Sequence, residues 1–389
     1  MKKIIYVVIV LLITMIVSLS IGGVLLAKDY KSPELNFKDI EQEEFIDVSD
    51  LNSISINMGY DKVIVSPTNN SKIYLKYSGK MKSTSDDFNA SLNIKKDNIG
   101  KLSLDKRSYN TDNKIRIFNF EETYRSELVL EIFIPQDKLF DLNVKESLIK
   151  ISDLKFNNLD VETYSRNIVL DNIGADLISL KTSSGDVFAK EIHSKDFSLV
   201  TYSGTVEFDS FEADDINLKL SSGDLVVDFK ENSSNTNFNI KGYSSKVFVN
   251  NLNSKNFESD LTSGLINVKN SKIDRINSKG SSSDLSFISL LFKNAKITTV
   301  SGDINLNVLD LGDLNIETNS GDINLDLEED VSFNLKFETN SGELSNTFPI
   351  ILDPSSNTYS NYDVSGLIGN SSMAKDVFIQ TSSGNLIIN

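Results

Sequence analysis

Hydrophobic residues along most of this chain alternate with polar ones in steps of two, and a recurring Ser-Gly phrase interrupts the alternation. Around Gly223, apolar residues stand at positions 216, 218 and 220, and again at 225 and 227. A period of two is typical of a β-strand, whose successive side chains face opposite sides. The phase changes at the glycine, so each unit is predicted to be a strand, a tight corner, a second strand and a return turn.

The Ser-Gly phrase returns at a nearly constant interval, and we call its glycine, or the residue in that place, the corner position. Most neighbouring corner positions lie 19 residues apart, with a step of 22 after Gly223, one of 21 after Gly321 and a long final one. A unit this short buries its apolar face only by stacking on its neighbours. The pattern therefore predicts an all-β, single-coil-repeat β-solenoid with about 19 residues per coil and about a dozen coils. The corner positions are Arg166, Gly185, Gly204, Gly223, Ser245, Gly264, Ser283, Gly302, Gly321, Gly342 and Gly384.

The residue types at the corners have structural explanations. Glycine permits positive φ without a clash of Cβ, so the corner glycines are predicted to be turn residues. The serine before each corner position is predicted to point inward and to hydrogen-bond to the neighbouring coil. Threonine three residues before several corner positions is predicted to form a similar inward ladder. Solenoid packing is favoured over the alternative of a Ser/Thr-rich site. The corner glycines are Gly185, Gly204, Gly223, Gly264, Gly302, Gly321, Gly342 and Gly384.

The repeat extends upstream of these phrases, but less regularly. The template fits corner positions at Ser147 and Asp61, and it fits only in part at Lys80. Between about 81 and 127 the register is lost, which indicates inserted loops and hairpins. We therefore predict irregular N-terminal β coils over 46–139 and a regular solenoid over 140–389. A Pro-, Asn- and Ser-containing excursion at about 346–376 is predicted to be a loop that caps the solenoid.

The N-terminal residues predict a membrane anchor. Residues 4–27 are apolar and uncharged, and 24 residues are enough to span a bilayer as a helix. Lys2 and Lys3 precede them, which favours a cytoplasmic N-terminus and an extracytoplasmic bulk of the chain. A cleaved signal peptide is the alternative, but its apolar stretch is usually shorter, and residues 25–27 are a poor cleavage site. We predict an uncleaved signal anchor within 1–27, a single-pass protein of the cell membrane, and a polar stalk over 28–45.

Composition excludes several functions. The chain has 55 acidic and 39 basic residues, a net charge of −16, which argues against a nucleic-acid or anionic-lipid partner. It has no cysteine, so it has neither disulfides nor thiol chemistry. The single histidine, His193, stands in a predicted return turn without a nucleophile arrangement around it. No phosphate-binding glycine loop or metal-spaced histidine cluster is present, so we predict neither an enzyme nor a cofactor.

One outward column is acidic. Asp284, Asp303, Asp322 and Glu343 directly follow corner positions and are predicted to lie on four successive coils. Carboxylates at a spacing of roughly 4.8 Å would repel one another, and a calcium ion could relieve that repulsion. The alternative is that aspartate after glycine is ordinary turn chemistry. The column is interrupted elsewhere, and the turn interpretation is favoured.

A second outward column is aromatic. Tyr164, Tyr202 and Tyr243 stand two residues before corner positions on every second coil. Their spacing of roughly 10 Å is close to the repeat of a disaccharide. Phe188 and Phe248 face outward on the neighbouring strand. These rings are predicted to form a platform for a glycan or a partner strand, the alternative being cross-coil stacking that stiffens an exposed sheet.

Over roughly 46–389 the chain resembles the bacterial DUF4097 family, described as adhesins with β-strand repeats. The resemblance rests on the Ser-Gly phrases followed by an acidic residue or Asn and then Ile, Leu or Val, on the strand ending at Ile134-Pro135, and on the closing TSSGNLIIN. The Gly366 and Gly369 segment also fits. The resemblance implies a membrane-anchored or surface β-solenoid and supplies no catalytic residues. Some members resemble accessory proteins of envelope-stress systems in Gram-positive bacteria.

Three functions are therefore weighed. The first is a non-enzymatic surface or cell-envelope interaction module that binds a cell-wall glycan or an envelope protein. The second is a regulatory accessory of an envelope-stress system, acting through a membrane partner near residues 1–45. The third and least favoured is a carbohydrate-active enzyme, which would need grouped carboxylates in a groove.

Overall fold

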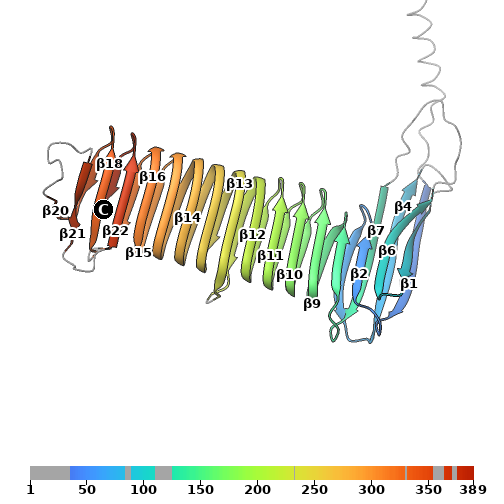
Figure 1. The fold of residues 1–389 in the computed structure, drawn as a ribbon. Helices are drawn as coiled ribbons and strands as arrows, with labels where there is room; N and C mark the ends of the chain where they lie inside the picture. The colour runs from blue at the N-terminus through green and yellow to red at the C-terminus, as the bar shows by residue number, and fades with distance from the viewer. Residues whose placement is uncertain are drawn as a thin grey trace, which may run out of the picture.

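The molecule is a long stack of β-strands that runs from β1 at one end to β20 and β21 at the other (Figure 1). The computed structural model describes residues 36–83, 89–109, 125–231, 233–328, 331–353, 363–369 and 375–389, and its strands form one open sheet of 23. The predicted signal anchor over 4–27 lies outside the described residues. Within the described part of the chain, no helix is long and apolar enough to cross a membrane.

The central strands confirm the predicted coils. Each strand pairs in parallel with its successor, and Ile168 lies opposite Val187, one 19-residue repeat further on. At the longer step, Leu225 of β12 lies opposite Val247 of β13, so the three extra residues are absorbed in the turn between these strands. The strands of this part are β9 (Leu148–Thr163), β10 (Ile168–Thr182), β11 (Val187–Thr201), β12 (Val206–Phe229), β13 (Asn235–Asn250) and β14 (Asn253–Ser301).

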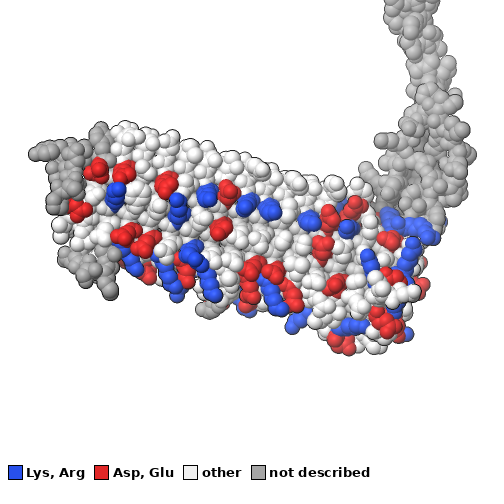
Figure 2. Space-filling model, viewed as in Figure 1, with Lys and Arg blue, Asp and Glu red and all other residues white. Residues whose placement is uncertain are grey.

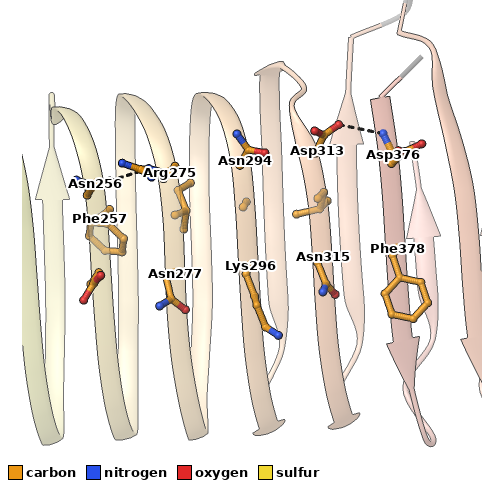
Figure 3. Close-up of a pocket in the computed structure, with 14 residues that line it drawn as sticks. Asn256, Phe257, Arg275, Asn277, Asn294, Lys296, Asp313, Asn315, Asp376 and Phe378 are labelled. Atoms are coloured by element: carbon orange, nitrogen blue, oxygen red, sulfur yellow. Dashed lines mark hydrogen bonds between the residues drawn. The ribbon is translucent and has the colours of Figure 1, made fainter. Parts of the chain in front are cut away.

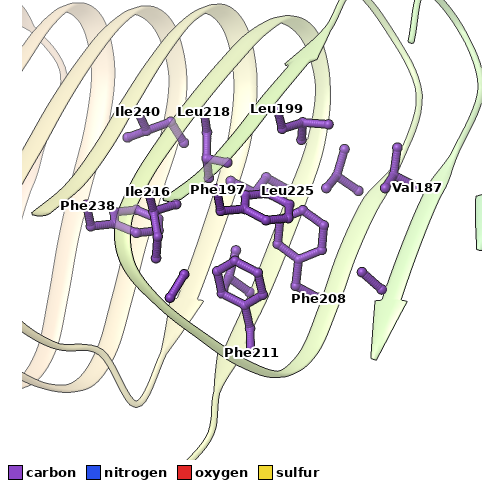
Figure 4. Packing of buried hydrophobic residues seen from close by; sticks show 14 of the residues in the cluster. Val187, Phe197, Leu199, Phe208, Phe211, Ile216, Leu218, Leu225, Phe238 and Ile240 are labelled. Carbon is purple, nitrogen blue, oxygen red and sulfur yellow. The ribbon is translucent and has the colours of Figure 1, made fainter. Parts of the chain in front are cut away.

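The interior is a continuous apolar column to which every coil contributes. Figure 4 shows a central part of this column. Phenylalanine rings meet across coils, since Phe238 stacks on Phe257 of the next coil at 5.6 Å between ring centroids. Within the Gly204 coil, Phe197 packs edge-on against Phe211 at 4.8 Å. Burying such a ring contributes roughly 1.5–3 kcal/mol relative to leaving it in water. No coil could bury these rings alone, so the packing explains why the repeats stack.

Many coils have three sides rather than two strands and a simple return turn. In seven coils the residue six positions after the corner has positive φ, for example 52° at Asn172 and 51° at Asn270, and the backbone bends there a second time. Most residues at this bend are Asn, Asp or Ser, and Asn and Asp tolerate the left-handed conformation better than most side chains do. A short third side follows, in which residues 173–175 pair with residues 192–194.

One prediction about the serines that precede the corner positions is wrong. All the serines before the corner positions are exposed or half-buried, so their predicted inward orientation is wrong. The inward position is the corner residue, as the burial of Ser245 and Ser283 shows. Two outward residues in succession, such as Ser183 and Ser184, separate the inward Thr182 from the inward Gly185. The alternation of inward and outward residues is therefore displaced by one position after the turn. The predicted hydrogen bonds between coils are present, since Ser222 Oγ donates to the carbonyl oxygen of Tyr202 at 3.2 Å.

The threonines three residues before the corners are buried, as predicted, but they bond within their own coil. Thr182 Oγ1 accepts a hydrogen bond from the backbone N–H of Gly185 at 2.9 Å. At Gly264 a side chain is excluded on two grounds, because φ is 130° and a Cβ would overlap the carbonyl oxygen of Ser245 on the preceding coil. Glycine therefore lets the corners of adjacent coils approach each other.

The N-terminal end is closed by antiparallel strands that lie beyond the first coil. That coil consists of β2 and β3, which pair with β8 and β9 on one side and with β6 and β7 on the other. β5 then pairs with β6, β4 with β7, and β1 with β4, all antiparallel. The strands are β1 (Asn36–Asp47), β2 (Ser53–Asn57), β3 (Lys62–Thr68), β4 (Lys72–Ser83), β5 (Asn89–Lys96), β6 (Lys101–Tyr109), β7 (Arg125–Pro135) and β8 (Asp141–Lys145).

One prediction for this end is wrong. Residues 36–45 of the predicted polar stalk belong to β1, which covers the edge of β4; the remainder of that stalk, 28–35, lies outside the described residues. The polar composition of β1 reflects its position as an outer strand that buries Ile40 but few other side chains. The template fits only in part at Lys80 because a single strand, β4, continues through it to Ser83. β4 pairs antiparallel with β1 and β7.

The C-terminal coil is threaded out of order. β22 pairs with β16 on one side and β18 on the other, with Val377 opposite both Leu314 and Leu335. The final coil therefore lies between the coils of Gly321 and Gly342 instead of after them. The strands of this end are β15 (Ile304–Asp310), β16 (Asp313–Ser320), β17 (Ile323–Leu327), β18 (Phe333–Thr339), β19 (Leu344–Asn346), β20 (Ile350–Leu352), β21 (Asp363–Ile368), β22 (Lys375–Thr381) and β23 (Leu386–Ile388).

The predicted loop cap at about 346–376 contains two strands in its described part. β21 pairs antiparallel with the outermost coil strand, β18, and β20 pairs antiparallel with β21. Both ends of the stack thus finish in antiparallel strands, which cover the parallel edges that the coils would otherwise expose. Residues 354–362 and 370–374 of the predicted cap lie outside the described part of the chain.

Candidate functional site

The strands that precede the corners present one long outward surface, which we call the pre-corner face. It consists of the side chains two, four, six and eight residues before the corner positions. In-register pairing aligns these residues in columns, as Asn237 beside Asn256 shows. The face carries both the tyrosine column and the polar groove described below.

The three predicted tyrosines are strongly exposed. The exposed fraction is 70% for Tyr164, 63% for Tyr202 and 70% for Tyr243. Their backbones are fixed by the next coil, because the carbonyl oxygens of Tyr164 and Tyr202 accept hydrogen bonds from the N–H of Ser184 and Ser222 at 2.9 and 2.8 Å. The rings therefore project into solvent from a rigid backbone, as a platform for a ligand requires.

The two phenylalanines predicted to face outward do not lie on the pre-corner face. Phe248 is 37% exposed and Phe188 is half-buried, and both lie on the strands that follow the corners, away from the pre-corner face. Sequence analysis missed Tyr60, which is 71% exposed and lies 5.4 Å below the guanidinium of Arg166. Tyr60 precedes the irregular corner at Asp61, so the Ser-Gly phrase did not identify it.

A groove of about 680 Å³ crosses five coils of the pre-corner face (Figure 3). Two rows of side chains line it, and neither was identified from the sequence. The row eight residues before the corners contains Asn256, Arg275, Asn294, Asp313 and Asp376. The row six residues before the corners contains Glu258, Asn277, Lys296, Asn315 and Phe378. Amides, carboxylates, two cations and an aromatic ring thus face one hollow.

Hydrogen bonds between coils hold the first row. Asp313 Oδ1 accepts a hydrogen bond from the backbone N–H of Asp376 at 3.2 Å, and Asp376 Oδ1 accepts one from Asn334 Nδ2 at 2.9 Å. Arg275 donates through Nε to Asn256 Oδ1 at 2.9 Å. Asn294 is exposed and makes no side-chain hydrogen bond to the described residues.

The second row is anchored at its centre and ends in an aromatic ring. Lys296 Nζ lies 3.1 Å from Glu317 Oε1, and Asn315 Nδ2 donates to the same oxygen at 3.2 Å. Phe378 is half-buried, with the ammonium of Lys336 at 5.2 Å from its ring centroid. Sequence order would have placed Lys336 beside Asn315. The out-of-order final coil brings Phe378 there instead.

The acidic column is a backbone ladder. Asp284 Oδ1 accepts a hydrogen bond from the N–H of Asp303, and Asp303 Oδ1 accepts one from the N–H of Asp322, both at 3.0 Å. The four acidic residues do not occupy four successive coils, because Asn385 of the inserted coil lies between Asp322 and Glu343. Within the residues that the structure describes, no group of three His, Cys, Asp or Glu side chains could hold a metal ion.

His193 belongs to a charged surface row on the third side of the coils. Its Nδ1 lies 3.0 Å from Glu212 Oε2, and Lys230 Nζ lies 3.9 Å from that oxygen. Figure 2 shows that cations and anions are interspersed in this way over the face in view. Such mixing gives a solvated surface without a large single-sign patch on that face, which does not favour a highly charged polymer as partner.

A model of the DUF4097 family, named Toastrack, matches residues 51–240 and 227–389. Among solved structures, a proposed cell adhesion protein of Clostridium sporogenes is 11% identical over 90% of this chain and 99% of its own, with a TM-score of 0.17. A proposed lipid-binding protein of Parabacteroides distasonis is 15% identical over 72% of this chain and 96% of its own, with a TM-score of 0.36. TM-scores this low support no inference about function. No curated protein sequence matches the chain significantly.

Proposed function

Because this chain belongs to the DUF4097 Toastrack family, we propose that it is a non-enzymatic surface module that holds an envelope partner on its pre-corner face. The observation that carries this proposal is the continuity of that face. Exposed tyrosines occupy its first half and a polar groove occupies its second half, all on one hydrogen-bonded scaffold. Side chains on such a scaffold bind with little loss of conformational freedom, since the backbone is already ordered.

The proposed location follows from the N-terminal sequence. Residues 4–27 anchor the chain in the cell membrane with the N-terminus in the cytoplasm, and the solenoid projects outside. The partner in this proposal is a cell-wall glycan or an envelope protein with an uncharged or mixed surface. The surplus of acidic residues supports this choice over nucleic acid, which requires a surplus of cations.

The test is binding of the full chain to isolated cell walls, measured by co-sedimentation. Replacing Tyr164, Tyr202 and Tyr243 together by serine should weaken saturable binding at least about tenfold while the melting temperature stays within a few degrees, because the rings are exposed. Phe248→Ser is the matched control, since it removes an exposed ring from another face. Absence of saturable binding would reject the adhesin-like function and favour the regulatory one, in which exchange of residues 4–27 for an unrelated anchor abolishes signalling.

A further inference from the structure

The groove on the pre-corner face has the dimensions of an extended polymer segment. Its first row spans the coils from Asn256 to Asp376, which are four steps of roughly 4.8 Å each. Two coils correspond to roughly 10 Å, close to the repeat of a disaccharide. A polymer of sugar rings lying along the stack would therefore meet one pair of side chains from the two rows at each coil, and each disaccharide would span two such pairs.

The side chains in the groove suit hydroxyl groups. Asn277 and Asn294 each offer both a donor and an acceptor, and the carboxylates of Asp313 and Asp376 each have a second oxygen available to a ligand. Neighbouring hydroxyls on a sugar ring donate to a carboxylate and accept from an amide at the same time. Phe378 adds an aromatic face against which the apolar side of a sugar ring can stack.

The alternatives fit the groove less well. An added peptide strand needs an open sheet edge, whereas the strands under this groove are paired on both sides. An acidic ligand needs a surplus of cations, but the lining holds three carboxylates against two cations. One of those cations, Lys296, is already paired with Glu317.

We infer that this groove binds a neutral oligosaccharide, with Phe378 stacked on one sugar ring and the amides and carboxylates of the two rows bound to hydroxyls. The site depends on the threading of the final coil, because Phe378 and Asp376 both come from β22. The inference rests on the proposed surface function and names the ligand class for the second half of the face.

The experiment titrates the full chain, in a detergent without a sugar headgroup, with neutral tetrasaccharides of glucose, mannose, galactose and N-acetylglucosamine by calorimetry. An acidic tetrasaccharide of galacturonate serves as the charged counterpart. We expect at least one neutral sugar to bind and Phe378→Ala to weaken it about tenfold, the effect of 1.4 kcal/mol. Asn294→Ala, at a residue without a side-chain partner among the described residues, should weaken binding severalfold without altering the melting temperature. Phe248→Ala is the control and should bind as the unchanged protein does.

Three results would overturn the inference: no neutral sugar binds, the galacturonate binds more tightly, or both groove variants bind as the control does. These results are separable from failure of the proposed function. Tyrosine-dependent binding to cell walls without oligosaccharide binding would leave the surface function standing and remove the sugar groove. Loss of both would reject both.

Discussion

At the residue scale, the most unusual side chain is the buried carboxylate of Asp61, at the corner of the first coil. Only 2% of this residue is exposed. Tyr77 donates its hydroxyl to Oδ2 at 2.7 Å, and the ammonium of Lys106 lies 2.8 Å from Oδ1. The network joins the first coil to β4 and β6, so it ties the irregular end to the regular stack.

Removal of this carboxylate should be costly. Asp61→Ala takes away the charge that faces the largely buried Lys106, and breaking a buried pair in this way costs about 3–5 kcal/mol of unfolding free energy. Glu162→Ala is the control, because it breaks an ion pair with Lys145 that is half exposed and should cost less than about 1 kcal/mol. Urea unfolding of both variants measures the difference, and equal losses would show that the Asp61 network does not stabilise the fold.

The sequence predicted residue positions better than residue partners. Alternation identified Thr182 as buried and Tyr202 as exposed, because parity along a strand fixes which face a side chain occupies. It misplaced the corner serines, since a tight turn changes the parity in a way that only the backbone geometry shows. It also missed the second bend of the coil, such as the one at Asn172. The equivalent position in other coils holds Asn, Asp, Glu or Ser, so no common sequence phrase marks it.

At the element scale, the two ends of the molecule show how strand edges are covered. β1 is the outer strand beside β4, and β5 is the outer strand beside β6. The side chain of Gln42 in β1 links it to β5. Its Nε2 donates to the carbonyl oxygen of Leu92 at 3.3 Å, and its Oε1 accepts from the N–H of Leu92 at 3.1 Å. One amide side chain thus occupies both the N–H and the carbonyl oxygen of Leu92. These groups belong to an outer strand and would otherwise be open to another chain.

Gln42→Ala should therefore loosen β5 without unfolding the solenoid. Loss of two hydrogen bonds should lower stability by about 1–3 kcal/mol and speed amide hydrogen exchange at Leu92. Gln42→Glu is the informative control, because it keeps an acceptor for the N–H of Leu92 but loses the donor. Unchanged exchange in β5 of the alanine variant would mean that this edge is protected by other contacts.

The elements also show where sequence analysis fails. Strands from β9 to β14 were predictable because each pairs with its successor, so one repeat length fixes the register. β4 and β22 have the same alternation of polar and apolar residues, but alternation does not specify which strand lies alongside. The groove was missed for that reason, since Phe378 meets Asn315 only through a pairing between strands that are distant in the sequence.

At the scale of the whole molecule, the threading of the final coil makes the C-terminal end cooperative, unlike the rest of the stack. In a simple solenoid each coil contacts only its neighbours, so removal of a terminal coil costs one interface. Deletion of residues 375–389 should instead separate β16 from β18, because β22 lies between them. It should likewise separate β19 from β17, which keeps its pairing with β15. We expect fast hydrogen exchange in β18, β19, β20 and β21 of the truncated chain, while β9 to β12 remain protected because their partners are unchanged. Protection of β18 after the deletion would mean that the Gly342 coil can close directly onto the Gly321 coil. In that case the sequential order of coils would be accessible to the chain, and the final coil would be an insertion on which the stack does not depend.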